Sequence, residues 1–391
     1  MRIKQISVDG LFGIFDHVIP LNRDERITVI HGLNGFGKTA ILRILNGFFN
    51  YRYFELRKIP FKKFKIELDN DEIIEIVKEF KDSDKEKKIF FLNKTQTLES
   101  EKLSLSYSSS RKKRSSLITP TGAASEWLQK FQNSIHIRLI ESQRLNSGPN
   151  LSSSTQSTAK AYSDELAKLM QDQFREYGRT SQSLDRTFPF RIVKQQPSIN
   201  VTNEQLRQQL DELESTRSHL IEIGLLDKEE DSEFKIHPQD IDESTKNVLS
   251  VYVEDVEKKL NVFAETAKKI YLMRRIINKK FAYSYKEINF SKQKGFVFTT
   301  EHNQELSPSD LSSGEQHELV LLYELLFKTE PNSLVLIDEP ELSLHVAWQI
   351  EFLKDLKEIT ELADIDILMA THSPDIIQDR WDLTVELKRP D

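Results

Sequence analysis

The sequence predicts a protein of the α/β class, in which a parallel sheet is accompanied by an antiparallel side sheet and interrupted by a helical hairpin. Three observations lead to this prediction. Short apolar runs alternate with helical patterns around residues 27–49 and again after residue 282, as in parallel sheets. Residues 64–107 carry β-branched and aromatic residues with partial alternation, which favours antiparallel strands. Residues 203–280 carry apolar residues at helical spacing.

We therefore expect an α/β domain that is split by an insertion. The first lobe is expected over residues 1–145, the helical insertion over 146–281 and the second lobe over 282–391. A length of 391 residues suits two or three such units and a large buried core.

The elements of the first lobe follow from their residue types. RIKQISVDG, HVIPLN and RITVIHG are each expected to form a short strand, and ILRILNGFF is expected to form a helix with one apolar face. The run IHIRLI at 135–140 is expected to be a buried strand. Residues 108–121 are rich in Ser and include four consecutive basic residues at 111–114, which indicates an exposed, solvated loop rather than a nucleic-acid contact.

The insertion is expected to begin with a linker, because residues 146–162 are rich in Ser, Thr and Gln without an apolar period. A helix is expected over 203–225 and a second over about 240–280, which would be about 60 Å long if unbroken. Together they predict an antiparallel hairpin. In the second lobe KGFVFTT, SLVLID and DIDILMAT are expected to be strands separated by helices.

Composition excludes several classes of protein. The chain has no cysteine, which excludes disulfides, thiolate zinc sites, iron–sulfur clusters and a cysteine nucleophile. A net charge of −7 does not support bulk attraction to nucleic acid, although a local basic face is compatible with it. No apolar run is long enough to cross a membrane and the N-terminus lacks the pattern of a signal peptide, so we expect a cytoplasmic protein without a membrane partner.

Residues 32–39, GLNGFGKT, match the phosphate-binding pattern G-x-x-x-x-G-K-[ST] between a predicted strand and a predicted helix. Backbone N–H groups around Asn34, Gly35 and Gly37 are expected to surround the phosphates. Lys38 supplies a charge for the β- and γ-phosphates, and the hydroxyl of Thr39 can bind Mg²⁺. The motif therefore predicts a site for ATP and Mg²⁺.

The predicted strand SLVLID in the second lobe contains an apolar run, LVLI, which is followed by two acids. Asp338 is placed to hold the Mg²⁺ shell, and Glu339 is placed to polarise an attacking water. His372 follows the strand after that one, in the sequence ATHS, where it can reach a γ-phosphate. The clustering of these residues with the P-loop predicts ATP hydrolysis.

The segment LSSGE at 311–315 precedes a Leu-rich helix and allows two interpretations. Ser312 or Ser313 can cap the helix, with Glu315 as the acid of a capping box. Alternatively, the exposed hydroxyls and N–H groups contact a phosphate on another subunit. The spacing alone does not distinguish these interpretations.

These motifs, in this order, resemble the ATP-binding cassette (ABC) superfamily, and within it the soluble RecF/SMC/OLD-like branch. The resemblance covers about 1–145 and 282–391. It implies a two-lobed ABC-type P-loop ATPase that forms a head-to-head dimer around two ATP molecules. It assigns nucleotide contacts to Lys38 and Thr39 and, across the dimer, to Ser313, Gly314 and the D-loop residue Ser343. It assigns Mg²⁺ to Thr39, Asp338 and the Q-loop residue Gln143, and catalysis to Glu339, His372 and Gln143.

One departure from the branch is the turn LFGI at 11–14, which lacks the basic residue of a Phe-Arg-Gly-like turn. Four fragments are similar to ATPases of bacterial anti-phage defence modules, the Septu PtuA and PARIS AriA groups. They are residues 31–39, 184–189, 312–317 and 370–374 with 379–382. This similarity implies a homodimer or higher homo-oligomer that senses phage and regulates a separate effector nuclease, because no nuclease domain fits after Asp382.

Two alternatives remain open at this point. A RecF-like repair ATPase would bind DNA directly, and the basic residues between 268 and 280 would then line a groove. The same residues can also be a solvated helix face balanced by the acids at 254–257. A nucleotide-binding scaffold without turnover is a third possibility, against which the presence of Glu339 argues.

Overall fold

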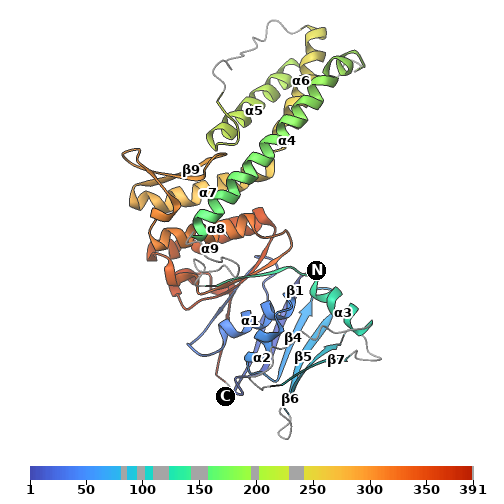
Figure 1. The fold of residues 1–391 in the computed structure, drawn as a ribbon, viewed down its shortest axis with the longest axis vertical. Helices are drawn as coiled ribbons and strands as arrows, with labels where there is room; N and C mark the ends of the chain where they lie inside the picture. Colours follow the sequence, from blue (N-terminus) through green and yellow to red (C-terminus); the bar gives the residue numbers. More distant parts are fainter. Residues whose placement is uncertain are drawn as a thin grey trace. The chain divides into compact units, whose positions relative to one another are not determined.

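The structure is a computed structural model that describes residues 1–80, 86–94, 102–108, 123–141, 157–194, 202–228 and 242–389. The chain divides into two compact units (Figure 1). Met1–Arg144 and Glu324–Asp391 form the first unit, and Leu145–Tyr323 forms the second. The expected insertion over 146–281 lies within the second unit.

A parallel sheet lies at the centre of the first unit. Its strands occur in the order β14-β3-β13-β12-β8, and each neighbouring pair is parallel. The bounds are β3 Ile27–His31, β8 Ile137–Ile140, β12 Leu334–Asp338, β13 Asp366–Ala370 and β14 Thr384–Glu386. Every residue of β12 is buried, as its continuous apolar sequence predicts. Because the strands are parallel, their carboxyl ends lie along one edge, where the predicted catalytic residues follow them.

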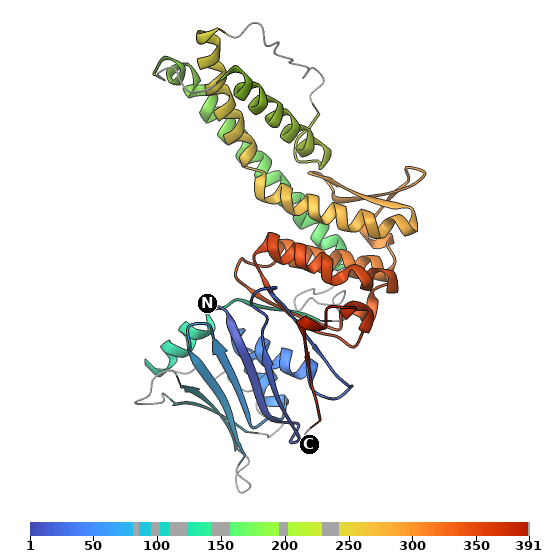
Figure 2. The ribbon, with the colours of Figure 1, turned by 180° about the vertical axis from the view of Figure 1, so that it is seen from behind.

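An antiparallel sheet forms the other layer of the first unit, with strand order β2-β1-β4-β5-β6-β7 (Figure 2). The bounds are β1 Ile3–Leu11, β2 Phe15–Pro20, β4 Lys63–Leu68, β5 Ile73–Phe80, β6 Glu86–Asn93 and β7 Lys102–Ser108. Helix α1 (Lys38–Phe49) shares one apolar core with both sheets, since Ile41 and Leu45 cluster with Ile66 and Leu336. Helices α2 (Tyr53–Lys58) and α3 (Ala123–Gln132) complete this region. The predicted side sheet is confirmed.

Helices also follow the last strands of the parallel sheet. Helix α9 (Val346–Ala363) connects β12 to β13, and the short α10 (Pro374–Ile377) follows β13. The one-turn helices η5 (Pro340–Ser343) and η6 (Trp381–Leu383) lie in the connections. Parallel strands joined by helices confirm the α/β class of the fold.

Four helices make up most of the second unit. They are α4 (Thr158–Lys194), α5 (Asn203–Glu222), α6 (Glu243–Asn261) and α7 (Ala264–Phe281). A small antiparallel sheet, β9 (Lys286–Ser291), β10 (Gly295–Thr300) and β11 (Glu305–Leu306), follows η3 (Ala282–Ser284). The turn η4 (Pro308–Asp310) then leads into α8 (Ser313–Phe327). This sheet is tied to α4, because the Ser163 hydroxyl donates to Lys294 O at 2.8 Å and accepts from Phe296 N at 2.8 Å.

Helix α4 pairs in antiparallel fashion with α6 and α7. Arg191 near the end of α4 forms an ion pair with Asp255, and Asp185 pairs with Lys259 at 2.7 Å. Gln173, earlier in α4, reaches Thr266 in α7. An antiparallel helical hairpin is therefore present, but its two arms are α4 and α6–α7. The predicted pairing of 203–225 with 240–280 is wrong, because α5 packs beside α6 and runs in the same direction.

Two expectations about the insertion were wrong in detail. Residues 158–162 are helical, not part of a linker, because Ala159 and Ser163 are small residues buried at helical spacing with Leu166. The fragment 184–189 lies inside α4. The helix expected over 240–280 is broken at Val262, where Phe263 is buried against Tyr177 with ring centroids 5.4 Å apart.

Among the described helices, none combines the length and apolar character that crossing a bilayer requires. The expected exposed loop with its basic run at 111–114 lies outside the described residues, as does most of the linker that was expected before residue 158.

Candidate functional site

The P-loop connects β3 to α1 in the first unit. Gly37 is the N-cap of α1 with φ 93°, and no side chain caps the helix there. A Cβ on Gly37 would collide with the side chain of Leu11. Gly35 has φ 87°, and both Asn34 and Gly35 are exposed. The glycines therefore let the chain curl closely around the N-terminus of α1, whose N–H groups stay open to an anion.

Lys38 is buried and lies folded back on the P-loop. Its Nζ donates to Gly32 O at 2.8 Å and to Leu33 O at 3.3 Å. The Nδ1 atom of His372 lies 3.3 Å from the same Nζ. Burial lowers the pKa of Lys38, while the nearby Glu339 and Glu341 oppose this change. The ammonium is thus held where an incoming phosphate can take over its hydrogen bonds.

Thr39 and Asp338 join the P-loop to the end of β12. The Thr39 hydroxyl donates to Asp338 Oδ1 at 2.9 Å. Asp338 is buried, and burial raises the pKa of its carboxyl to about 6, although the bond from Thr39 acts in the opposite direction. A hydroxyl and a carboxylate in contact at a buried position are the oxygen ligands that Mg²⁺ prefers. A cation placed there would compensate the buried charge, so these residues fit the expected metal.

Glu339 and His372 lie beside this pair. Glu339 has a left-handed backbone with φ 46°, and its N–H donates to Ala370 O at 2.8 Å. Its Oε1 lies 3.6 Å from His372 Nε2. The N–H of His372 donates to Glu341 Oε1 at 2.6 Å. The predicted base and the predicted switch histidine are therefore brought together with Lys38, as strand order at the carboxyl edge of the sheet requires.

The remaining predicted site residues have other positions. Gln143 lies outside the described residues. The backbone of Ser343 forms the end of η5, next to Glu341. Ser313 and Gly314 begin α8 and belong to the second unit. The structure therefore places the P-loop, Asp338, Glu339 and His372 in one unit, and the signature residues in the other.

The signature segment forms a capping box. Ser312 N donates to Glu315 Oε2 at 2.8 Å, and Glu315 N donates to the Ser312 hydroxyl at 3.4 Å. Lys286 also bonds Glu315, at 2.9 Å. Burial alone would raise the pKa of Glu315, but the bonds from Lys286, Ser284 and Ser312 outweigh it and lower the pKa. Ser312 is thus used for capping, while Ser313 is part of the helix itself.

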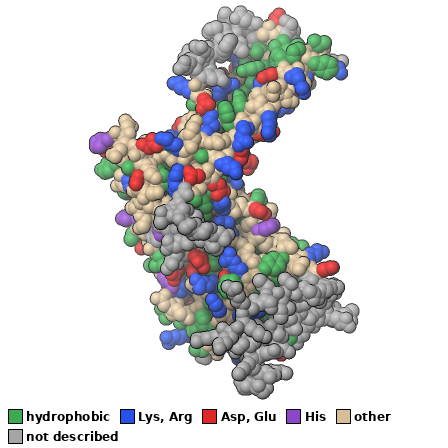
Figure 3. Space-filling model, in the orientation of Figure 1, with side chains coloured by type: hydrophobic (Ala, Val, Ile, Leu, Met, Phe, Trp, Pro, Cys, Tyr) green, Lys and Arg blue, Asp and Glu red, His purple; other side chains and the backbone are tan. Residues whose placement is uncertain are grey.

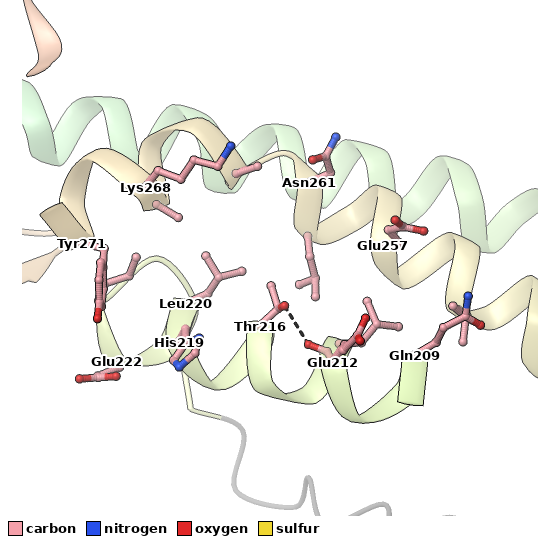
Figure 4. A pocket seen from close by; sticks show the side chains of 16 residues that line it. Gln209, Glu212, Thr216, His219, Leu220, Glu222, Glu257, Asn261, Lys268 and Tyr271 are labelled. Carbon is pink, nitrogen blue, oxygen red and sulfur yellow. Dashed lines mark hydrogen bonds between the residues drawn. The ribbon is translucent and has the colours of Figure 1, made fainter. Parts of the chain in front are cut away.

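Two cavities of similar size are candidates for a nucleotide site. One, of about 650 Å³, borders the P-loop in the first unit. The other, of about 640 Å³, lies between α5, α6 and α7 (Figure 4). Its charged lining consists of Glu212, Glu222, Glu257 and Lys268. Three carboxylates against one ammonium disfavour a polyphosphate, so this cavity is a poorer candidate for a nucleotide site than the cavity beside the P-loop.

The cavity beside the P-loop contains residues to which the sequence analysis gave no role. His31 and Trp381 both line it, with ring centroids 5.4 Å apart in an edge-to-face arrangement. Trp381 is half exposed. Glu341 was also assigned no contact. The sequence signals for these residues were the histidine that begins the fragment 31–39, the Trp in the fragment 379–382 and the acid two residues after Glu339.

The basic residues of α7 are largely neutralised. Arg274 pairs with Glu222 and Glu287, and Lys268 pairs with Glu265. Lys280 forms a buried ion pair with Glu318 of α8. On the face drawn in Figure 3, Lys and Arg side chains alternate with Asp and Glu over the described helices of this unit. This arrangement favours the solvated, balanced helix over a DNA-binding groove.

Several solved structures are distantly similar to this chain. The Smc head domain of Pyrococcus furiosus, with an extended coiled coil and bound to the C-terminal domain of ScpA, is 13% identical with a TM-score of 0.44. The match covers 100% of this chain and 94% of that chain. The SMC head domain of Thermotoga maritima is 12% identical with a TM-score of 0.36, over 97% of this chain and 92% of that chain.

A comparison with curated proteins finds no match. A family model described as an AAA ATPase domain matches residues 1–377, which is nearly the whole chain and includes the P-loop, both acids and His372. The chain therefore belongs to the AAA ATPase domain family.

Proposed function

We propose that this chain binds ATP with Mg²⁺ at the P-loop and hydrolyses it, as an ABC-type ATPase of this family. One observation carries the proposal. Thr39 is bonded to Asp338, and on the same edge of the sheet Lys38 and Glu339 both approach His372. Residues far apart in sequence thereby form a cationic, a metal-ligating and a basic group in one place, which is what phosphoryl transfer to water requires.

The roles follow from the positions. The N–H groups at Asn34, Gly35 and Gly37 surround the phosphates, and Lys38 leaves Gly32 O to reach them. Thr39 and Asp338 would hold Mg²⁺, which would neutralise phosphate charge when bound. Gln143 is added to these ligands by the resemblance alone, since it lies outside the described residues.

Glu339 accepts the proton of the attacking water. His372 orients the γ-phosphate, with its Nε2 directed at Glu339.

Calorimetric titration with ATP and Mg²⁺ tests the assignment. Lys38→Ala is expected to abolish binding, because it removes the charge directed at the phosphates. Lys354→Ala, which removes an exposed lysine of α9 in the same unit, is the matched control and is expected to bind normally. Unchanged ATP affinity in Lys38→Ala would contradict the P-loop assignment.

We propose further that two copies close head-to-head on ATP, with Ser313, Gly314 and Ser343 of one copy contacting the nucleotide of the other. The proposal is supported by the resemblance of the motifs to the ABC superfamily. Glu339→Gln should bind ATP but hydrolyse it slowly, and should therefore accumulate the closed dimer. If this variant stays monomeric with ATP by light scattering, the head-to-head arrangement is wrong.

The biological role that we propose is sensing and gating of a separate effector nuclease in anti-phage defence. It is supported by the similarity of the fragments around the P-loop, the signature and His372 to ATPases of such modules. Balanced charges on α7 count against the RecF-like alternative. Native mass measurement after co-expression with the flanking genes tests it, since a dimer carrying only DNA would favour repair instead.

A further inference from the structure

Glu341 reaches from η5 to the loop that carries His372. Its Oε1 accepts a hydrogen bond from the backbone N–H of His372 at 2.6 Å. Its other oxygen, Oε2, is buried and has no hydrogen-bond partner among the described residues. A buried carboxylate oxygen without a partner is unfavourable, so a side chain kept in this position needs a reason.

The imidazole of His372 lies between two groups of the site. Lys38 Nζ is 3.3 Å from Nδ1, and Glu339 Oε1 is 3.6 Å from Nε2. Because an ammonium can only donate, Nδ1 must be the acceptor, and the neutral ring then carries its proton on Nε2. The ring can occupy this bridging position only while the backbone at residue 372 stays in place.

Two side chains hold the segment of His372 and Ser373, one through the backbone and one through a side chain. Glu341 holds the N–H of His372, and Gln349 of α9 accepts from the Ser373 hydroxyl at 2.6 Å. Gln349 is itself fixed, because its Nε2 donates to Leu344 O at 3.1 Å. The bond to Glu341 is charge-assisted and is therefore the stronger type of restraint.

We propose that Glu341 is a positioning residue of the nucleotide site. By accepting a hydrogen bond from the backbone N–H of His372, it holds the imidazole of that residue between Lys38 and Glu339. The proposal rests on the proposed function, because positioning matters for the reaction only if His372 takes part in it. The side-chain hydrogen bond of Glu341 goes to the backbone of His372 and not to Thr39, Asp338 or the P-loop. Its effect is expected in turnover rather than in nucleotide affinity.

Steady-state ATPase measurements test the kinetic part. Glu341→Ala should lower kcat roughly 10- to 100-fold, as the loss of a residue that orients a functional side chain does, with KM for ATP within a factor of about three. Glu341→Gln keeps an oxygen that can accept the N–H and should recover most of kcat. Adding Glu341→Ala to His372→Ala should lower kcat no further. Glu361→Ala, an exposed acid of α9, is the matched control.

A second readout does not depend on turnover. In ¹⁵N spectra of histidine-labelled protein without nucleotide, the His372 signal, assigned by its loss in His372→Ala, should report the Nε2–H tautomer. Glu341→Ala should shift it toward a mixture of tautomers, and Glu341→Gln should not.

An unchanged His372 signal in Glu341→Ala would overturn the proposal whether or not the protein hydrolyses ATP. Additive losses of kcat in the double variant would overturn it as well. Absence of ATPase activity in the wild type, with the spectral change still present, would instead count against the proposed function.

Discussion

Replacing Asp338 by Asn should stabilise the nucleotide-free protein while removing a predicted metal ligand. Asp338 is 6% exposed, and burial raises its pKa from 3.8 to about 6. This difference in pKa corresponds to about 3 kcal/mol by which the ionised carboxyl disfavours the folded state. Asn carries no charge, and its Oδ1 can still accept the hydrogen bond from Thr39.

The pH dependence follows from the sign of this shift. Below pH 3.8 the carboxyl is protonated in both states, so Asp338 does not reduce stability there. The destabilisation by the ionised Asp338 grows as the pH rises from 3.8 to about 6, and it is constant above that pH. The advantage of Asn should therefore be full at pH 8 and about half as large near pH 5.

Thermal unfolding with EDTA and without nucleotide measures this difference. For a unit of this size, about 3 kcal/mol corresponds to a rise in Tm of roughly 6–12 °C at pH 8. Asp379→Asn, at an exposed acid of the same unit, should leave Tm unchanged. Equal Tm values for Asp338→Asn and the wild type at pH 8 would refute the reasoning, as would a difference that grows toward pH 5.

Three further substitutions follow from the backbone and the buried charges. Gly37→Ala should abolish ATP binding by calorimetry and lower Tm, because φ is 93° there and the new methyl group would meet Leu11; normal binding would contradict this. Gly178→Ala, at an open position inside α4, should instead raise stability by about 0.5–1 kcal/mol in denaturant unfolding, and a loss would be unexpected. Lys280→Met should lower stability by about 3–5 kcal/mol, because it leaves the fully buried Glu318 without its cation. Adding Glu318→Leu should restore most of that loss, and a double variant as unstable as the single one would refute the explanation.

Local sequence was sufficient to predict that the P-loop lies close to Asp338, Glu339 and His372. The P-loop is a contiguous motif, and Asp338 and Glu339 follow a strand whose apolar run is unmistakable. Parallel strands then bring these residues together at one edge whatever lies between them in sequence. His372 could be placed for the same reason, because it directly follows the neighbouring strand β13.

The insertion was less predictable because its helices depend on tertiary contacts. Helix α4 has small and polar residues such as Ser163 on its buried side, so its composition is that of a linker. The break near Val262 depends on how Phe263 packs against Tyr177, which no local period records. Glu341 was not predicted for a related reason. Its hydrogen-bond partner is a backbone N–H, which every residue except Pro carries, so the sequence does not indicate the contact.

The hydrogen bonds from Lys38 to Gly32 O and Leu33 O have a consequence for the anions that the proposed site would accept. An incoming anion must replace both bonds, and bonds to a charged donor contribute about 1.5–3 kcal/mol each. A single orthophosphate has few other contacts with which to offset this loss, whereas a triphosphate also meets the N–H groups of the loop. If the proposed nucleotide site is correct, free orthophosphate should therefore compete poorly with ATP for Lys38.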